Sequence, residues 1–173
     1  MTEPPVDDPV AAATDTVPTT ETFDRFCTLE GERLAKALAL ALDNRELGRD
    51  AAAEAMARAW ERWTTVCEYD NTAGWCYRVG LNWGRSRLRR RRREVTTAFP
   101  PDAPHDDPAV DDSMTTALAK LSTDHRAVIV GRFYLDWSEA DLATALAIPT
   151  GTAKSRLNRA LAQLEQHLGA DDV

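Results

Sequence analysis

Residues 138–165 read SEADLATALAIPTGTAKSRLNRALAQLE, and this stretch has the layout of a helix-turn-helix: a short helix, a tight turn and a longer second helix. Ser138 is a good N-cap for the first helix, and Asp141 follows it at the spacing of a capping box. Pro149 suits the first turn of the second helix, where a missing N–H is no loss. Four leucines at helical spacing are expected to form the core of the pair: Leu142, Leu146, Leu157 and Leu161.

The second helix of this pair opens with side chains suited to nucleic acid. Residues 150–152 are Thr, Gly and Thr, which keep the start of the helix slim enough to approach a base edge. Hydrogen-bond donors for phosphates and bases follow at Lys154, Ser155, Arg156 and Arg159. Helical pairs with a few basic residues are also common in globular proteins of other functions, so periodicity alone leaves both interpretations open.

The segment that precedes this pair divides into two short helices and a linker. Residues 114–137 continue the helical pattern, with Ser122 as an N-cap. Residues 94–113 read EVTTAFPPDAPHDDPAVDDS, with four prolines, six acids and no Lys or Arg. The segment has few large apolar groups, and burying them cannot offset the entropy lost in ordering the chain. We therefore expect a flexible acidic linker.

Three longer helices are expected before the linker, over about 23–43, 50–63 and 75–93, with Asp50 as the N-cap of the second. No strand pattern appears in the sequence, so the predicted fold class is all-α, with two small helical domains joined by the acidic linker. The expected divisions are an acidic, disordered tail without signal-peptide features (1–22), a first domain (23–93), the linker (94–113), a helix-turn-helix domain (114–168) and a short tail (169–173).

Positive charge is concentrated in a chain whose formal net charge is −7. Residues 85–93 read RSRLRRRRR, with seven arginines. Residues 23–93 carry 15 basic and 10 acidic side chains, whereas 1–22 hold five acids and no Lys or Arg. A polyanion would therefore meet a basic folded segment despite the acidic total. The alternative is that the arginines are a solvated helix end beside a C-terminal dipole, although their mutual repulsion argues against it.

Several classes of protein are disfavoured by what the sequence lacks. Cys27, Cys67 and Cys76 form no CxxC pair and leave one thiol unpaired in any disulfide scheme, which suggests a reducing cytosol. No run approaches the length of a membrane span. The histidines lie far apart, and no triad or metal-ligand spacing is present, so an enzyme, a metal site and a cofactor are not expected.

A family resemblance now becomes specific. Residues 121–164, and above all GTAKSRLNRA at 151–160, look like region four of bacterial RNA polymerase sigma factors, in the extracytoplasmic-function (ECF) subgroup. The resemblance implies a domain that binds the −35 promoter element. Where the family usually has Gly in the turn, this chain has Ala147, which costs roughly 1 kcal/mol if the residue is left-handed. The implied −35 contacts are Thr152, Lys154, Ser155, Arg156, Asn158 and Arg159.

Residues 49–63, RDAAAEAMARAWERW, resemble region 2.2 of the same family, with Ala53 in place of the usual Gln and Met56 in place of the usual Phe. In the family this surface binds the β′ clamp helices of core RNA polymerase, while the β flap is a further expected partner. The residues implied in polymerase binding are Asp50, Glu54, Arg58 and Trp60.

Residues 73–93, AGWCYRVGLNWGRSRLRRRRR, resemble regions 2.3 and 2.4, which bind and melt the −10 element. Arginine charge combined with aromatic and amide groups is what attraction of a duplex and capture of unstacked bases require. The loop 68–73 is expected to line the site of an unstacked base. The implied −10 residues are Tyr69, Asn71, Tyr77, Arg78, Asn82, Arg85, Arg89 and Arg90.

The sequence therefore predicts a cytoplasmic sigma factor, a subunit without enzymatic activity of its own that directs core polymerase to promoter DNA, opens the DNA and starts transcription. An anti-sigma factor is a possible further partner, and no membrane is expected to be one. Two alternatives stay open. One is a helix-turn-helix transcription regulator that acts without polymerase, and the other is a degenerate family member that serves as an interaction protein.

Overall fold

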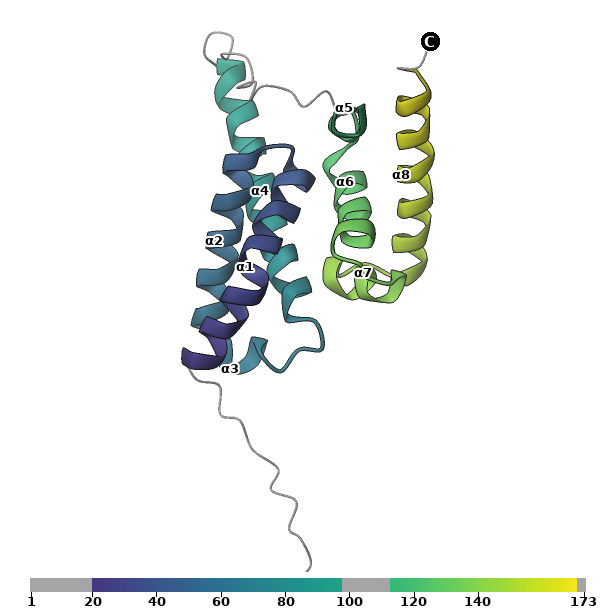
Figure 1. The fold of residues 1–173 in the computed structure, drawn as a ribbon. Helices are drawn as coiled ribbons and strands as arrows, with labels where there is room; N and C mark the ends of the chain where they lie inside the picture. The colour runs from purple at the N-terminus through teal and green to yellow at the C-terminus, as the bar shows by residue number, and fades with distance from the viewer. Residues whose placement is uncertain (1–19, 98–112, 171–173) are drawn as a thin grey trace, which may run out of the picture.

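The structure, a computed structural model, describes residues 20–97 and 113–170. Helices account for the regular structure in these ranges, and no strand occurs there, which confirms the all-α prediction (Figure 1). The expected tails at 1–19 and 171–173 and the linker residues 98–112 lie outside the described residues.

The first block of helices comprises α1 (Thr20–Leu42), α2 (Arg45–Glu61), α3 (Trp63–Val66) and α4 (Thr72–Thr97). The prediction of Asp50 as the N-cap of the second helix was wrong. Asn44 caps α2 instead, because its side-chain Oδ1 accepts a hydrogen bond from the Leu47 N–H at 2.7 Å. Asp43, in the left-handed region at φ 54°, turns the chain between α1 and α2, so Asp50 lies in the second turn. The helix also ends at Glu61, before Trp63 opens α3.

The helices of the first block approach one another closely through small residues. Leu34 and Leu38 of α1 are fully buried, and so are Ala51 and Ala55 of α2, within one hydrophobic cluster. At Gly48, a Cβ atom would lie 2.3 Å from the backbone nitrogen of Ala39, so the contact between α1 and α2 has no room for any side chain there.

The second block comprises α5 (Ser113–Ala119), α6 (Thr123–Ile129), the π-helical turn η1 (Val130–Tyr134), α7 (Glu139–Leu146) and α8 (Thr150–Ala170). The predicted N-caps Ser122 and Ser138 are confirmed, and Ser138 and Asp141 form a complete capping box. Pro149 lies one residue before α8, and its carbonyl accepts from Thr152 N–H at 2.9 Å. The α7 and α8 pair is thus the predicted helix-turn-helix.

The two blocks pack against each other (Figure 1). Helix α6 and η1 contact α1, and α7 contacts α4. The buried side chains of both blocks join in one hydrophobic cluster, in which Tyr77 of α4 meets Trp137 with ring centroids 5.4 Å apart. Helix α4 continues to Thr97 and so includes the first four residues of the expected linker.

Candidate nucleic-acid interface

The turn that positions α8 depends on a left-handed alanine. Ala147 has φ 53° and ψ 49°, and its N–H donates to the Thr144 carbonyl at 3.2 Å. The Ile148 N–H donates to the Ala143 carbonyl at 3.0 Å, so the end of α7 is closed as an αL cap. The strain expected at this position is therefore present, at about 1 kcal/mol relative to glycine.

Helix α8 has a buried face and an exposed face. Ala153, Leu157 and Ala160 are buried against the second block at the spacing of one helix face. The predicted −35 residues lie mostly on the other face: Lys154, Ser155, Asn158 and Arg159 are exposed, while Thr152 and Arg156 are half-buried. The structure therefore brings these six residues to the N-terminal half of one helix.

The Arg159 side chain is held along the helix. Its Nε donates to the Ser155 carbonyl at 3.1 Å and its Nη2 to the Ser155 Oγ at 3.3 Å. Ser155 Oγ in turn donates to the Thr152 carbonyl at 3.2 Å. These contacts limit the rotamers of the guanidinium, so less side-chain entropy is lost when it binds a base or a phosphate.

Helix α4 carries the arginines of 85–93. Asn82, Arg89 and Arg90 are exposed, and Arg78 and Arg85 are half-buried. Arg89 Nη2 donates to Ser86 Oγ at 3.0 Å, and Arg90 Nε donates to Glu94 at 2.8 Å. The guanidinium of Arg85 reaches out of the first block and pairs with Asp124 of α6.

Tyr77 is placed differently from the other predicted −10 residues. It is fully buried, and its hydroxyl donates to the Ala127 carbonyl at 3.2 Å. Burial also raises the pKa of the Tyr77 hydroxyl well above its ordinary value. Tyr77 is buried because its ring packs edge-on against Trp137 of the second block, with ring centroids 5.4 Å apart. In this arrangement Tyr77 packs between the blocks and does not reach a DNA-facing surface.

The loop between α3 and α4 borders a cavity of about 370 Å³. Asn71 holds the loop in place, because its Oδ1 accepts from the Gly74 N–H at 2.6 Å at the start of α4. The structure thus brings together three of the residues predicted to bind the −10 element, Tyr69, Asn71 and Arg78. Sequence reasoning assigned no role to the other lining residues on the second block, Thr144 and Ala145 of α7.

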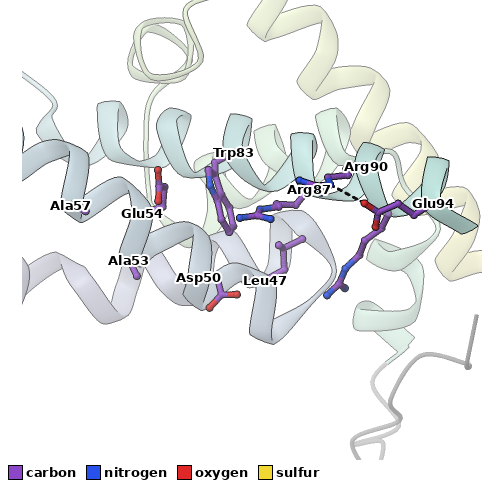
Figure 2. A pocket seen from close by; sticks show the side chains of 10 residues that line it. Leu47, Asp50, Ala53, Glu54, Ala57, Trp83, Arg87, Arg90 and Glu94 are labelled. Atoms are coloured by element: carbon purple, nitrogen blue, oxygen red, sulfur yellow. Dashed lines mark hydrogen bonds and ion pairs between the residues drawn. The ribbon is translucent and has the colours of Figure 1, made fainter.

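A second hollow, of about 710 Å³, runs between α2 and the C-terminal half of α4 (Figure 2). Asp50 and Glu54 open onto it from α2, next to the small Ala53 and Ala57, so two of the predicted polymerase-binding residues share one groove. Glu54 accepts from Arg58 Nε at 2.8 Å. We call this hollow the α2–α4 groove.

The other wall of the α2–α4 groove comes from α4: Trp83, Arg87, Arg90, Arg91 and Glu94. The Arg87 guanidinium carbon lies 4.8 Å from the centroid of the Trp83 ring, a cation–π distance. The sequence analysis did not single out Trp83 or Arg87 as binding residues. Trp60, the fourth predicted polymerase-binding residue, lies elsewhere, half-exposed against Phe23 with centroids 5.0 Å apart.

Other kinds of site find little support in the described ranges. Across 20–97 and 113–170, no three His, Cys, Asp or Glu side chains gather as they would around a metal ion. No helix in the same ranges is both long and apolar enough to span a membrane. Cys76 is buried, and desolvation raises its thiol pKa to about 12, which is unlike a reactive thiolate.

Comparisons with known proteins agree with this geometry. A family model described as sigma-70, region 4, matches residues 111–164. The RNA polymerase sigma-E factor of Streptomyces coelicolor is 33% identical over 127 residues, which cover 69% of this chain and 70% of that protein. The ECF RNA polymerase sigma factor SigM of Mycobacterium tuberculosis is 30% identical over 158 residues, covering 85% of this chain and 77% of that protein.

A solved structure shares the fold. It is a co-crystal structure of the sigma factor RpoE with the anti-sigma factor NepR from Bartonella quintana, with a TM-score of 0.71 and 23% identity. The match covers 87% of this chain and 99% of that one. The relatives that match over most of their length show that the chain belongs to the ECF family of RNA polymerase sigma factors, in agreement with the helix-turn-helix and the arginine-rich α4.

Proposed function

We propose that this sigma factor reads the −35 promoter element with α8 and the −10 element with α4, while the α2–α4 groove binds core RNA polymerase. The observation that carries the proposal is the division of α8 into a buried apolar face and an exposed face with four polar donors. We also propose that it works in the cytoplasm, where it has no catalytic step of its own and leaves the phosphodiester chemistry to polymerase.

The exposed face of α8 supports base reading. Lys154 and Asn158 lie four residues apart, and so do Ser155 and Arg159, so these side chains share one side of the helix and can reach base edges together in a major groove. Arg159 suits the two acceptors of guanine, and Asn158 suits adenine. Arg156 lies at the edge of this face and suits a phosphate.

Helix α4 and the loop before it support −10 binding. Arg89 and Arg90 are exposed and offer charge to the DNA backbone. Tyr69 is 45% exposed beside the loop cavity, where an unstacked base would find an aromatic surface and the amide of Asn71. We therefore assign duplex attraction to the arginines and capture of a single-stranded base to the loop.

The α2–α4 groove supports the polymerase contact. Its α2 wall carries the acidic Asp50 and Glu54, and its α4 wall carries Arg87, Arg90 and Arg91 together with Glu94. A partner helix with complementary charges would be held in one direction only. The alanines on α2 leave room for its larger side chains.

An anti-sigma protein is a further proposed partner. The supporting observation is that the RpoE sigma factor with the same fold was crystallised with an anti-sigma factor.

The test is transcription in a reconstituted system. Core polymerase from the protein's own host is incubated with genomic fragments, with and without the purified chain, and run-off transcripts are sequenced. New transcripts that begin at a shared pair of upstream elements are expected. A transcript set identical to that of core polymerase alone would contradict the proposal.

A further inference from the structure

The arginine-rich part of α4 has two distinct sides. Residues three and four apart lie on the same side of a helix, because one turn takes 3.6 residues. One such row lines the α2–α4 groove, and its members are Trp83, Arg87, Arg90, Arg91 and Glu94. A second row begins five residues earlier, which is about 140° around the helix. None of its members lines the groove, and they are Arg78, Asn82, Arg85 and Arg89.

The two sides of α4 differ in the charge that a ligand would meet. Opposite the groove arginines, the α2 wall carries Asp50 and Glu54, and Glu94 lies on α4 itself. DNA phosphates that entered the groove would therefore face carboxylates, which repel them. The second row holds no acidic residue, since residues 75–93 contain none. A uniform polyanion suits this second row, whereas the groove suits a partner that carries both kinds of charge.

Arg87 is the groove arginine that is best prepared for a partner. Its guanidinium carbon lies 4.8 Å from the centroid of the Trp83 ring, and the side chain extends along that ring (Figure 2). Trp83 packs against the hydrophobic cluster, so the ring itself is held in place. Within 20–97 and 113–170 no carboxylate pairs with Arg87, whereas Arg90 Nε is bonded to Glu94 at 2.8 Å. The donors of Arg87 are therefore open to a ligand.

A stacked pair of this kind is typical of a contact between proteins. Tryptophan and arginine are enriched among the few residues that carry most of the energy of a protein interface. Stacking fixes the plane of the Arg87 guanidinium, so its remaining N–H groups can meet a carboxylate with little further loss of side-chain entropy. Ala53 and Ala57 on the opposite wall are short, and the hollow of about 710 Å³ leaves room for a side chain of the partner.

We propose that the arginine run 85–93 serves two partners. Arg87, stacked on Trp83, binds an acidic side chain of core RNA polymerase in the α2–α4 groove, whereas Arg89 on the other side of α4 binds a DNA phosphate. The inference rests on the proposed function, because it names the chemistry of the polymerase group that meets the same groove. It gives different roles to two arginines that are only two positions apart in one basic stretch.

The test compares Arg87→Gln with Arg89→Gln in the full chain. Both positions are exposed, and each change removes one positive charge from the same helix. Glutamine and arginine have similar helix propensities, so α4 is expected to stay folded in both variants. Urea unfolding of each variant checks this before binding is measured.

Polymerase binding is measured by fluorescence anisotropy, with core polymerase from the protein's own host titrated into each variant labelled with fluorescein at its N-terminus. For Arg87→Gln we expect about tenfold weaker binding, as for a central charged residue of an interface. For Arg89→Gln the affinity should change by less than about twofold, because its side chain lies outside the groove.

Promoter binding is measured next, on promoters found by run-off transcription, at polymerase concentrations that saturate each variant and over a series of KCl concentrations. For Arg89→Gln, the slope of log K against log salt should become shallower by about 0.9, because one phosphate contact is lost. For Arg87→Gln, both the affinity and the slope should equal those of the unmodified chain.

Two further changes at Arg87 test the chemistry of the contact. Arg87→Lys keeps the charge but lacks the planar group that stacks on Trp83, so polymerase binding should be about threefold weaker than that of the unmodified chain. Arg87→Glu should bind more weakly than Arg87→Gln, because it places two negative charges together. Full binding by the lysine variant would contradict the role of Trp83, and equal binding by the Glu and Gln variants would contradict an acidic partner group.

Loss of polymerase binding confined to Arg87→Gln, with the change in salt dependence confined to Arg89→Gln, would support the division. Equal effects of the two variants in both measurements would overturn it. Weaker promoter binding by Arg87→Gln at saturating polymerase would also overturn it, because the groove would then bind DNA. Failure of the proposed function is a separate outcome, in which the unmodified chain itself does not bind core polymerase.

Discussion

The hydroxyl of Tyr77 donates a hydrogen bond to the carbonyl oxygen of Ala127, 50 residues further along the chain, at 3.2 Å. The tyrosine belongs to the helix that we assign to the −10 element, and the acceptor belongs to the block that carries the helix-turn-helix. The side chain is completely buried, so the contact is shielded from water. One residue thereby links the folding of the two blocks.

Tyr77→Phe is expected to lower the free energy of unfolding by about 0.5–1.5 kcal/mol at neutral pH, because the Ala127 carbonyl, which also accepts from the Val130 N–H, loses the hydroxyl donor. The pH dependence should change as well. Burial raises the pKa of Tyr77 above its ordinary value of 10.0, so the folded chain keeps a proton that the unfolded chain releases. This contribution to stability is complete below pH 10 and declines as the pH rises further.

The phenylalanine variant should therefore lose less stability than the unmodified chain above pH 10, as measured by urea unfolding across pH. Tyr69→Phe is the control, since Tyr69 is 45% exposed. If the free energy of unfolding falls equally with pH above 10 for Tyr77→Phe and for the unmodified chain, the buried hydroxyl has no such role.

Ala147→Gly is expected to stabilise the protein by about 0.5–1 kcal/mol. Glycine relieves the left-handed strain at φ 53°, and part of this gain is offset by the greater freedom of glycine in the unfolded chain. Ala162→Gly, at an exposed position within α8, should instead destabilise by about 1 kcal/mol. Thermal or urea unfolding of both variants measures whether each change raises or lowers stability. Destabilisation at both positions would contradict the role given to Ala147.

Sequence patterns predicted the helix-turn-helix well because its signals are local. Ser138, Asp141 and the small residues at 150–152 each act within one turn of the chain, and they indicate where α7 begins and where α8 opens. The start of α2 was missed because Asp50 and Asn44 are both competent caps. The choice between them depends on Asp43, whose left-handed backbone turns α1 into α2.

Contacts between distant parts of the chain could not be predicted from the sequence. The pairing of Arg85 with Asp124 joins residues 39 apart, and no spacing rule brings them together. The same holds for Tyr77, which a family pattern places among DNA-binding residues and which packing places between the blocks. The α2–α4 groove forms only where two helices pack together, so the sequence alone could not predict that Trp83 and Arg87 line it together with Asp50.

Arg159→Ala is expected to weaken use of −35 elements by about 1–3 kcal/mol if the side chain reads a base, and the loss should vary with the base at one promoter position. Gln166→Ala, two turns farther along the exposed side of α8, should leave transcription unchanged. Run-off transcription from promoters that differ in one −35 base measures both. An equal loss on every promoter would mark Arg159 as a phosphate contact instead.

Ala53→Trp is expected to block polymerase binding without unfolding the chain. Ala53 is exposed and lines the α2–α4 groove, so a large ring would fill the space intended for a partner helix. Ala140→Trp, at an exposed position on α7, is the matched control. Pull-down of core polymerase should fail for the first variant and succeed for the second. If the Ala53→Trp variant still binds polymerase, the polymerase contact lies outside the groove.

The most direct test of the central claim is gel filtration of the purified protein mixed with core RNA polymerase from its own host, followed by a gel-shift on the promoters found by run-off transcription. We predict that the protein elutes with polymerase, and that a specific shift requires both components. A protein that elutes separately from polymerase and shifts the same DNA alone would contradict this account and favour a helix-turn-helix regulator that acts without polymerase.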